Sequence, residues 1–535
     1  MIFMSASVLI FVLYPILCIL GGSVFIDGHF TLQEYTDLFS KNRVLLEHSF
    51  FTAACTAVIS TVLGVLIAIR ISALRGWRRT VLSAVLLMTM VSPPFISSLM
   101  YIQLYGRRGW ITYRLLHLSV SPYNQWGIIA MQSLHCASLN ALFLLGYIEK
   151  LDLRVIRASR DLGAGSTETF FNVVLPMLRP AMAVTAVLSF IRSMADFGTP
   201  AVIGGKYGTL ASEIYVQLIG YSKPAHAAAM NVLLLIPAVA AFILYRVLIR
   251  QGERMASTDR SRDYGDSAEL QPEGLFGLAV KGVCGFYMLA MLLQYICIFV
   301  SGFLKSKKGK YYFSLANFDE LFQYNLKSLV LSLKFALFVA LFGTLFGLVL
   351  AYYIERRSMP GKRLIDFLAT LPYLVPGTCM GIGYILAFNK PPLKLTGTAA
   401  IIAASMIFRQ LPVIMRIGSA SLLQIDRKLE NAARDLGAGR IAVIRDVILP
   451  GLAKAFATGF IYNFTGAMTT AGAVMFLITA KYKIAVYTLF DAINGGEYGV
   501  ASLLSSAIIL ITLAVSGTVT FLTGERRMKY DGHTG

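Results

Sequence analysis

The stretch Arg160-Asp161-Leu162-Gly163-Ala164-Gly165 occurs a second time, residue for residue, as Arg434-Asp435-Leu436-Gly437-Ala438-Gly439. In both copies nine residues separate the last glycine from a Leu-Pro pair, which is Leu175-Pro176 in the first copy and Leu449-Pro450 in the second. Each residue of the second copy lies 274 positions after its counterpart. A repeat of this length predicts two related halves, each presenting the same polar segment between apolar ones.

The composition indicates a polytopic membrane protein of the all-α class. Hydrophobic residues make up 56% of the 535-residue chain and charged residues only 14%. Soluble globular chains carry about 25% charged residues. Runs with almost no charge, such as 227–244 and 499–523, are long enough to cross a hydrocarbon core of about 30 Å as a helix.

Six apolar spans are expected in each half. The first half, 1–249, and the second half, 275–535, would be joined by a cytoplasmic linker at 250–274 that is charged and has no apolar period. An even number of spans makes both halves enter the membrane in the same direction, so a two-fold axis along the membrane normal should relate them. The expected spans are 4–26, 49–69, 81–105, 126–148, 181–203, 227–249, 275–303, 327–354, 364–388, 397–418, 455–478 and 498–523.

The net charge of +20 could indicate a nucleic-acid partner, or it could come from an excess of Lys and Arg in the cytoplasmic loops of a membrane protein. The position of the charges decides between these two explanations. With the N-terminus inside, the expected cytoplasmic segments contain 30 Lys and Arg residues and the opposite loops contain 15. This bias is typical of membrane proteins, so the basic balance does not require nucleic acid. We therefore expect both termini and both repeated segments on the cytoplasmic side of a lipid bilayer, with no nucleic-acid partner.

Each repeated segment is expected to form a compact knob on the cytoplasmic surface. A glycine can end a short helix at 153–162 or 427–436, and a second amphipathic stretch then leads to the Leu-Pro pair that begins or breaks the next span. The segments 153–176 and 427–450 would lie side by side as two copies of one docking surface. The alternative is a pair of ordinary basic loops. The sequences of such loops diverge freely, whereas these two segments have kept the same spacing and the same residues.

The segments resemble a motif of a known family. The pattern E-A-A-x-x-x-G, nine residues, I-x-L-P marks the membrane subunits of type I binding-protein-dependent ABC importers, in which it forms the coupling helix that docks on the ATPase. The leading Glu is replaced by Arg157 in the first copy and by Asn431 in the second, which removes the side chain of the family's usual salt bridge, and Glu430 lies one place too early. The resemblance assigns ATPase coupling to Ala158, Arg160, Asp161, Gly163, Ala164, Leu175 and Pro176, and to Ala432, Ala433, Arg434, Asp435, Gly437, Ala438, Leu449 and Pro450.

The fused layout is similar to a narrower group, the ferric-iron uptake permeases and their relatives. That group has A-D-F-G-T-P-A near the fifth span, which here is Ala195-Asp196-Phe197-Gly198-Thr199-Pro200-Ala201. The resemblance implies the type I ABC importer permease fold in a bacterial inner membrane, two copies of an ABC ATPase, an extracytoplasmic binding protein, and ferric iron as cargo. Relatives in the group carry thiamine, polyamines, phosphonates or sugar phosphates, so these cargoes remain open.

The chain itself has no pattern for catalysis or for a resident metal. It lacks G-x-x-x-x-G-K-[ST], so ATP and Mg are expected on the partner ATPase, with no cofactor and no enzymatic activity on this chain. The six His are scattered, and the six Cys form no CxxC pair. A secondary transporter driven by an ion gradient is the alternative class, but it would show acid or His relays in several spans and inverted repeats.

Two charges and one amide are the expected pathway residues. Arg192 and Asp196 lie four positions apart in the expected fifth span, so they would share a helix face as an ion pair that either lines the pathway or locks the bundle. The equivalent residues, Gly466 and Thr470, are uncharged, so the pathway should be asymmetric. Asn463, in the fifth span of the second half, is the third candidate.

Prolines interrupt the third expected span of each half. They are Pro93-Pro94 in the first half, and Pro372 and Pro376 in the second. Proline frees backbone carbonyls and bends a helix, so these spans should be broken, either to line a cavity or only to bend.

Overall fold

The computed structural model describes residues 2–26, 29–118, 121–256, 271–307, 310–357 and 361–531. Strands in this part of the chain form two antiparallel hairpins, β1 (Phe25–Ile26) with β2 (His29–Phe30) and β3 (Leu304–Lys307) with β4 (Lys310–Phe313). The rest of the regular structure is helical, with short π- or 3₁₀-helical turns labelled η. The all-α class is confirmed.

The elements of the first half follow the expected spans closely. They are α1 (Ile2–Val8), η1 (Leu9–Leu13), α2 (Tyr14–Gly22), α3 (Gln33–Lys41), α4 (Arg43–Ser72), α5 (Gly76–Val91), α6 (Ile96–Tyr105), η2 (Trp110–Leu115), α7 (Gln125–Ile148), α8 (Arg154–Asp161), α9 (Ser166–Thr169), η3 (Phe170–Val174), α10 (Leu175–Ala195), α11 (Gly198–Ile203), α12 (Leu210–Tyr215), η4 (Val216–Gly220) and α13 (Pro224–Ala256).

The second half repeats this order. Its elements are α14 (Gly274–Ser301), α15 (Ala316–Glu320), η6 (Leu321–Asn325), α16 (Leu326–Phe338), η7 (Val339–Gly343), α17 (Thr344–Arg356), α18 (Lys362–Thr370), η8 (Leu371–Tyr373), α19 (Gly377–Phe388), α20 (Ala399–Gln424), α21 (Arg427–Asp435), α22 (Arg440–Val443), η9 (Ile444–Ile448), α23 (Leu449–Thr469), η10 (Val474–Phe476), α24 (Ala485–Asn494) and α25 (Tyr498–Asp531).

Eleven of the expected spans are apolar enough to cross a membrane. Within the described residues, nine are single helices, and two more are helix pairs bent by 107° and 114° at the predicted proline positions. The break between α5 and α6 contains Pro93 and Pro94, and the break before α19 contains Pro376. The twelfth expected span, 455–478, corresponds to α23, whose bounds lie 274 positions after those of α10.

One expected boundary is wrong. The fifth span does not run from 181 to 203, because α10 ends at Ala195 and a separate helix, α11, begins at Gly198. Helix α13 continues to Ala256, into the segment expected as the linker at 250–274. The part of the linker at 257–270 lies outside the described residues.

The first span of each half packs against the other half. α2 contacts α19, and the hydroxyl of Tyr384 donates to the carbonyl of Phe11 at 2.7 Å. α14 contacts α4 and α6, and the hydroxyl of Tyr287 donates to the carbonyl of Leu134 at 2.8 Å. The halves are therefore separate in sequence but interlocked in space, and the largest apolar cluster contains buried residues of both.

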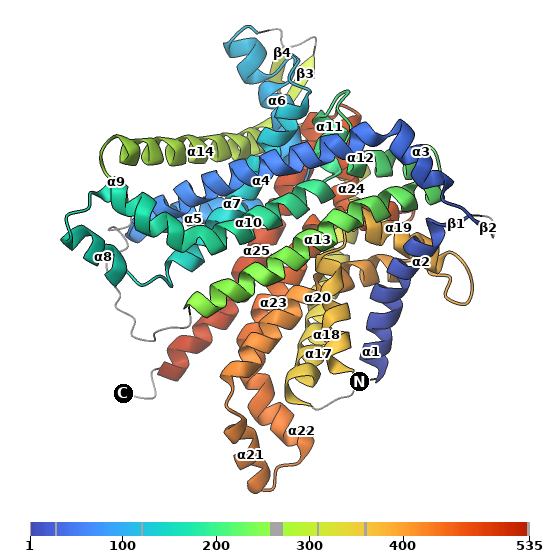
Figure 1. Cartoon of the computed structure of the whole chain (residues 1–535). Helices are drawn as coiled ribbons and strands as arrows, with labels where there is room; N and C mark the ends of the chain where they lie inside the picture. Colours follow the sequence, from blue (N-terminus) through green and yellow to red (C-terminus); the bar gives the residue numbers. More distant parts are fainter. Residues whose placement is uncertain are drawn as a thin grey trace.

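Figure 1 shows how the repeated segments lie relative to the bundle. α8 and α9 project at the left of the view and α21 and α22 at the bottom, while the hairpin β3–β4 lies at the top and the hairpin β1–β2 at the right. This arrangement agrees with two parallel halves that present their repeated segments at the same end.

Candidate functional site: two docking segments and the interface between the halves

The two repeated segments have the same backbone. α8 and α21 are short helices that each end two residues before a glycine with positive φ, +89° at Gly163 and +87° at Gly437. The amide of each glycine donates to the carbonyl three residues earlier at 2.9 Å. Glycine commonly ends a helix in this left-handed conformation because it has no Cβ to clash. The repeated sequence is therefore a helix stop followed by a tight turn.

The tip of each segment presents an apolar side chain to the outside. Leu162 and Leu436 occupy equivalent positions, and each is 89% exposed. The repeated sequence thus places the same apolar side chain at the same exposed position in both segments. These leucines were not assigned to coupling from the sequence, although each directly precedes the repeated glycine.

The residues that were assigned to coupling have three different surroundings. The exposed ones are Ala158, Asp161, Gly163, Ala432, Arg434, Asp435 and Gly437, and the half-buried ones are Arg160, Ala164, Ala433 and Ala438. The Leu-Pro pairs lie away from the tips, since Leu175-Pro176 begins α10 and Leu449-Pro450 begins α23. Proline is tolerated in the first turn of a helix because its missing N–H has no partner there. These pairs therefore define the start of each span.

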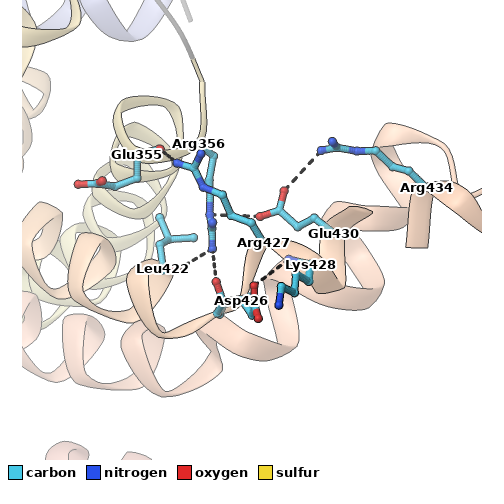
Figure 2. A network of polar contacts seen from close by, with 9 residues as sticks. Glu355, Arg356, Leu422, Asp426, Arg427, Lys428, Glu430 and Arg434 are labelled. Carbon is cyan, nitrogen blue, oxygen red and sulfur yellow. Dashed lines mark hydrogen bonds and ion pairs between the residues drawn. The ribbon is translucent and has the colours of Figure 1, made fainter. Parts of the chain in front are cut away.

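A buried ion pair anchors the second segment to the bundle (Figure 2). Nε of Arg356, the last residue of α17, lies 3.1 Å from Oε1 of Glu430 on α21, and the two side chains are only 7% and 6% exposed. The angle makes this a charge contact rather than an aligned hydrogen bond. Nη2 of Arg356 also donates to the carbonyls of Leu422 and Ile425, both at 2.6 Å. One guanidinium thus joins the ends of α17 and α20 to α21.

Further polar contacts fix the start of α21. The side chain of Asp426 caps the helix by accepting from the amide of Lys428 at 2.9 Å, and Nη2 of Arg427 donates to the carbonyl of Glu355 at 2.9 Å (Figure 2). The half-exposed Arg434 reaches Oε2 of Glu430 at 3.5 Å. The segment at α21 is therefore joined to α17 and α20 through several short contacts.

The first segment is anchored by different chemistry. Ile156, at the position equivalent to Glu430, is fully buried in an apolar cluster. The chain just before α14 covers this segment: the amide of Glu273 donates to Oγ of Ser166 at 2.9 Å, and the ring of Phe276 lies 5.4 Å from that of Phe170. The start of the second half therefore supports the docking segment of the first half.

An exposed polar contact caps the start of α8. The guanidinium of Arg154 donates to the carboxylate of Asp152 at 2.8 Å, and this hydrogen bonding lowers the pKa of Asp152. The equivalent residue in the second copy is Asp426, which caps α21 in the same way through a backbone amide.

The expected pairing of Arg192 with Asp196 on one helix face is wrong. Because α10 ends at Ala195, Asp196 leaves the helix, and its carboxylate accepts from Nε2 of Gln132 at 2.9 Å and from the amides of Gly198 and Thr199 at 3.0 and 3.1 Å. Asp196 therefore caps α11. The side chain of Arg192 is exposed.

The residues after Asp196 build an aromatic contact between the halves. The ring of Phe197 lies 6.2 Å from that of Phe476 and 6.4 Å from that of Phe490, and the ring of Phe95 lies 4.8 Å from Phe490. Gly198 has no space for a side chain, since a Cβ there would lie 2.2 Å from the Phe95 ring. The Asp-Phe-Gly sequence thus places one ring where the first half meets the second.

An arginine inside the second half was missed by the sequence analysis. Arg409 lies within α20, where Nη1 donates to the carbonyls of Pro372 at 3.2 Å and Val375 at 2.6 Å. These carbonyls lie at the proline break before α19. The break itself was the available signal, because the carbonyls it frees need a donor.

Asn463, the third candidate pathway residue, lies inside the second half. It is buried, and Nδ2 donates to Oγ1 of Thr344 at 2.8 Å. Asn463 therefore joins α23 to α17. Among the described residues, no group of three or more His, Cys, Asp or Glu side chains is arranged to hold a metal ion.

The fold and the paired segments define a class of protein: a polytopic helical permease built from two parallel repeats with matching docking segments. Residues 60–255 and 343–525 match the family described as "binding-protein-dependent transport system inner membrane component". The chain belongs to this family, and it is a multi-pass membrane protein.

Curated relatives cover both the whole chain and its halves. The chain is 30% identical over 533 residues to a ferric transport system permease protein, FbpB, of Actinobacillus pleuropneumoniae, which covers 97% of this chain and 77% of the relative. A sulfate transport system permease protein, CysT, of Salmonella typhimurium is 28% identical over 199 residues, 35% of this chain and 72% of the relative. A molybdate/tungstate permease protein, WtpB, of Thermococcus kodakarensis is 30% identical over 167 residues, 31% of this chain and 65% of the relative.

Proposed function

We propose that this chain is the membrane-spanning subunit of an ATP-driven importer for ferric iron. The observation that carries the proposal is the pair of identical glycine-capped segments, each with a leucine 89% exposed at its tip. Full-length similarity to a relative named as a ferric transport permease supports iron as the cargo. The chain itself is non-catalytic in this proposal, and ATP and Mg are bound by its partner.

The partners follow from the number of docking segments. One copy of the chain offers two equivalent surfaces, so it takes two ATPase subunits, and an extracytoplasmic binding protein delivers cargo to the opposite side. The assembly lies in a bacterial inner membrane with both termini cytoplasmic, in agreement with the two-to-one excess of Lys and Arg on that side.

The assembly is tested by purifying the chain with a co-expressed ATPase in detergent. We expect one permease chain for two ATPase subunits, measured by mass photometry, and loss of the complex when Leu162 and Leu436 are both changed to Asp. An exposed leucine outside the tips, Leu423→Asp, is the matched control. A one-to-one complex contradicts the proposal.

The cargo is tested in proteoliposomes that contain the complex and its binding protein. ATP-dependent uptake of ⁵⁵Fe(III) is expected. Uptake of sulfate, molybdate, phosphonate, thiamine, a polyamine or a sugar phosphate in place of iron would keep the importer class and replace the cargo. Uptake that follows an ion gradient without ATP would favour a secondary transporter instead.

A further inference from the structure

A groove on the surface of the bundle lies where α3 meets α4. It has a volume of about 530 Å³ and is lined by Phe39, Arg43, Leu46, Glu47 and Phe50. The two phenylalanine side chains are about half exposed, and the side chains of Arg43 and Glu47 are 75% and 58% exposed. The groove therefore combines apolar walls with one charge of each sign, and it is open to whatever surrounds the protein at this level.

Two exposed tryptophans mark the depth of the groove in the membrane, because tryptophan is enriched at both membrane–water interfaces. Trp126, near the start of α7, has its ring 6.1 Å from that of Phe51 on α4, and Trp77 lies near the start of α5, just after α4 ends. From Phe51 to Arg70, in the last turn of α4, the helix rises about 29 Å, close to a hydrocarbon thickness of about 30 Å. The hydrocarbon core therefore reaches from about Phe51 to about Arg70.

The charged pair of the groove lies just outside this core. Glu47 precedes Phe51 by four residues, which is about 6 Å along the helix axis, and the headgroup region on each side of a bilayer is about 5–8 Å thick. Nε of Arg43 lies 2.8 Å from Oε1 of Glu47, so the guanidinium and the carboxylate are at the same level. That level is the level of the lipid headgroups.

Both charged groups keep atoms that a headgroup can bind. Nε of Arg43 is used by Glu47, but within the described residues the Nη groups of Arg43 and Oε2 of Glu47 make no hydrogen bond. Guanidinium N–H groups bind phosphate oxygens, and a carboxylate accepts from an ammonium group. A headgroup that carries a phosphate and a primary ammonium satisfies both side chains, whereas a quaternary ammonium has no N–H to donate and an anionic headgroup has no cation for Glu47.

We propose that this groove binds phosphatidylethanolamine, with the phosphate on Arg43, the ammonium on Glu47 and the glycerol and upper acyl chains against Leu46 and Phe50. The site requires the bilayer that the fold itself requires, and it is independent of the cargo and of the ATPase. It lies at the end of α4 away from α8 and α9 (Figure 1). In the orientation proposed above, the lipid therefore belongs to the outer leaflet.

The test measures lipid binding to the delipidated full chain by native mass spectrometry. Phosphatidylethanolamine, phosphatidylcholine and phosphatidylglycerol with identical acyl chains are titrated separately. We expect phosphatidylethanolamine to bind about threefold to fivefold more tightly than the other two, which is the scale of one exposed ion pair. Equal affinities, or a preference for phosphatidylglycerol or phosphatidylcholine, overturn the proposal.

Two variants separate the roles of the charges. Glu47→Gln should bind phosphatidylethanolamine and phosphatidylcholine equally, because the acceptor for the ammonium is lost, and Arg43→Gln should weaken all three lipids, because each has a phosphate. Asp446→Asn breaks an exposed ion pair in the second docking segment, so it is the matched control and should keep the preference of the wild type. A preference that survives Glu47→Gln, or wild-type affinities in Arg43→Gln, would show that these side chains do not bind the headgroup.

Discussion

Removing the carboxylate of Glu430 should detach the second docking segment from the bundle. Two unit charges at the 3.1 Å separation of Arg356 and Glu430 attract by about 5 kcal/mol at an effective dielectric constant of about 20. Deleting one member of a buried pair typically costs about 3–5 kcal/mol, because the other charge is stranded. Arg356 keeps its two carbonyl acceptors and the charge contact is poorly aligned, so we expect the lower end, about 3 kcal/mol.

The substitution Glu430→Ile isolates this effect, because isoleucine is the residue that the chain buries at the equivalent position, Ile156. Hydrogen–deuterium exchange of the 427–435 peptide measures local opening of α21. A loss of about 3 kcal/mol makes exchange through local opening about two orders of magnitude faster, at 1.4 kcal/mol for each factor of ten. The peptide at 154–161 in the first segment serves as the internal reference.

Two further variants make the reasoning refutable. Arg356→Leu combined with Glu430→Ile should restore slow exchange, since replacing both members of a buried pair by apolar groups is often neutral. Asp446→Asn breaks an exposed ion pair with Arg445 in the same segment and should have little effect. Wild-type exchange in Glu430→Ile would show that the pair does not hold α21.

Three other changes test the remaining parts of the site. Gly437→Ala should destabilise the turn by about 1–2 kcal/mol through backbone strain alone, since open space surrounds the position, and Gly437→Asn should recover part of this loss; exchange of the same peptide measures both. Asp196→Ala should lower thermal stability by about 0.5–2 kcal/mol, the cost of a lost helix cap, and the unfolding midpoint in detergent reports it. Gly198→Ala should separate the halves at Phe95, and a cysteine pair placed across the Phe95–Phe490 contact should then cross-link more slowly; an unchanged cross-linking rate would contradict that role.

Much of the fold could be predicted because a membrane imposes simple rules on a sequence. Length and hydropathy locate the spans, and the exact 274-residue repeat predicts parallel halves. Gly163 and Gly437 were predictable as left-handed stops because the helix signal ends at each of them. The short hairpins and the interlocking of α2 and α14 with the opposite halves depend on tertiary packing, which periodicity does not encode.

The polar chemistry of the site was predicted less well, for a physical reason. Asp196 lies within an apolar run, so hydropathy alone continues the helix through it, whereas the carboxylate ends α10 by binding the amides of the next helix. Arg409 lies inside the expected span 397–418, but the sequence does not show that its partners are the carbonyls at the proline break. In the sequence Glu430 looks like the leading Glu of the family motif moved by one place. The structure shows that its partner is Arg356, which lies 74 positions earlier in the chain.

The two docking segments are more alike than the two sides of the interface between the halves. The docking segments share one backbone, as two identical ATPase subunits would require, and they are anchored differently on their buried sides, where Ile156 in the first segment corresponds to Glu430 in the second. The charges at the interface between the halves are not duplicated in this way, since Arg192 and Arg409 have Gly466 and His135 as their counterparts. If the shared backbone serves docking, Leu162→Asp and Leu436→Asp should impair coupling equally, because the two side chains are equally exposed at equivalent positions.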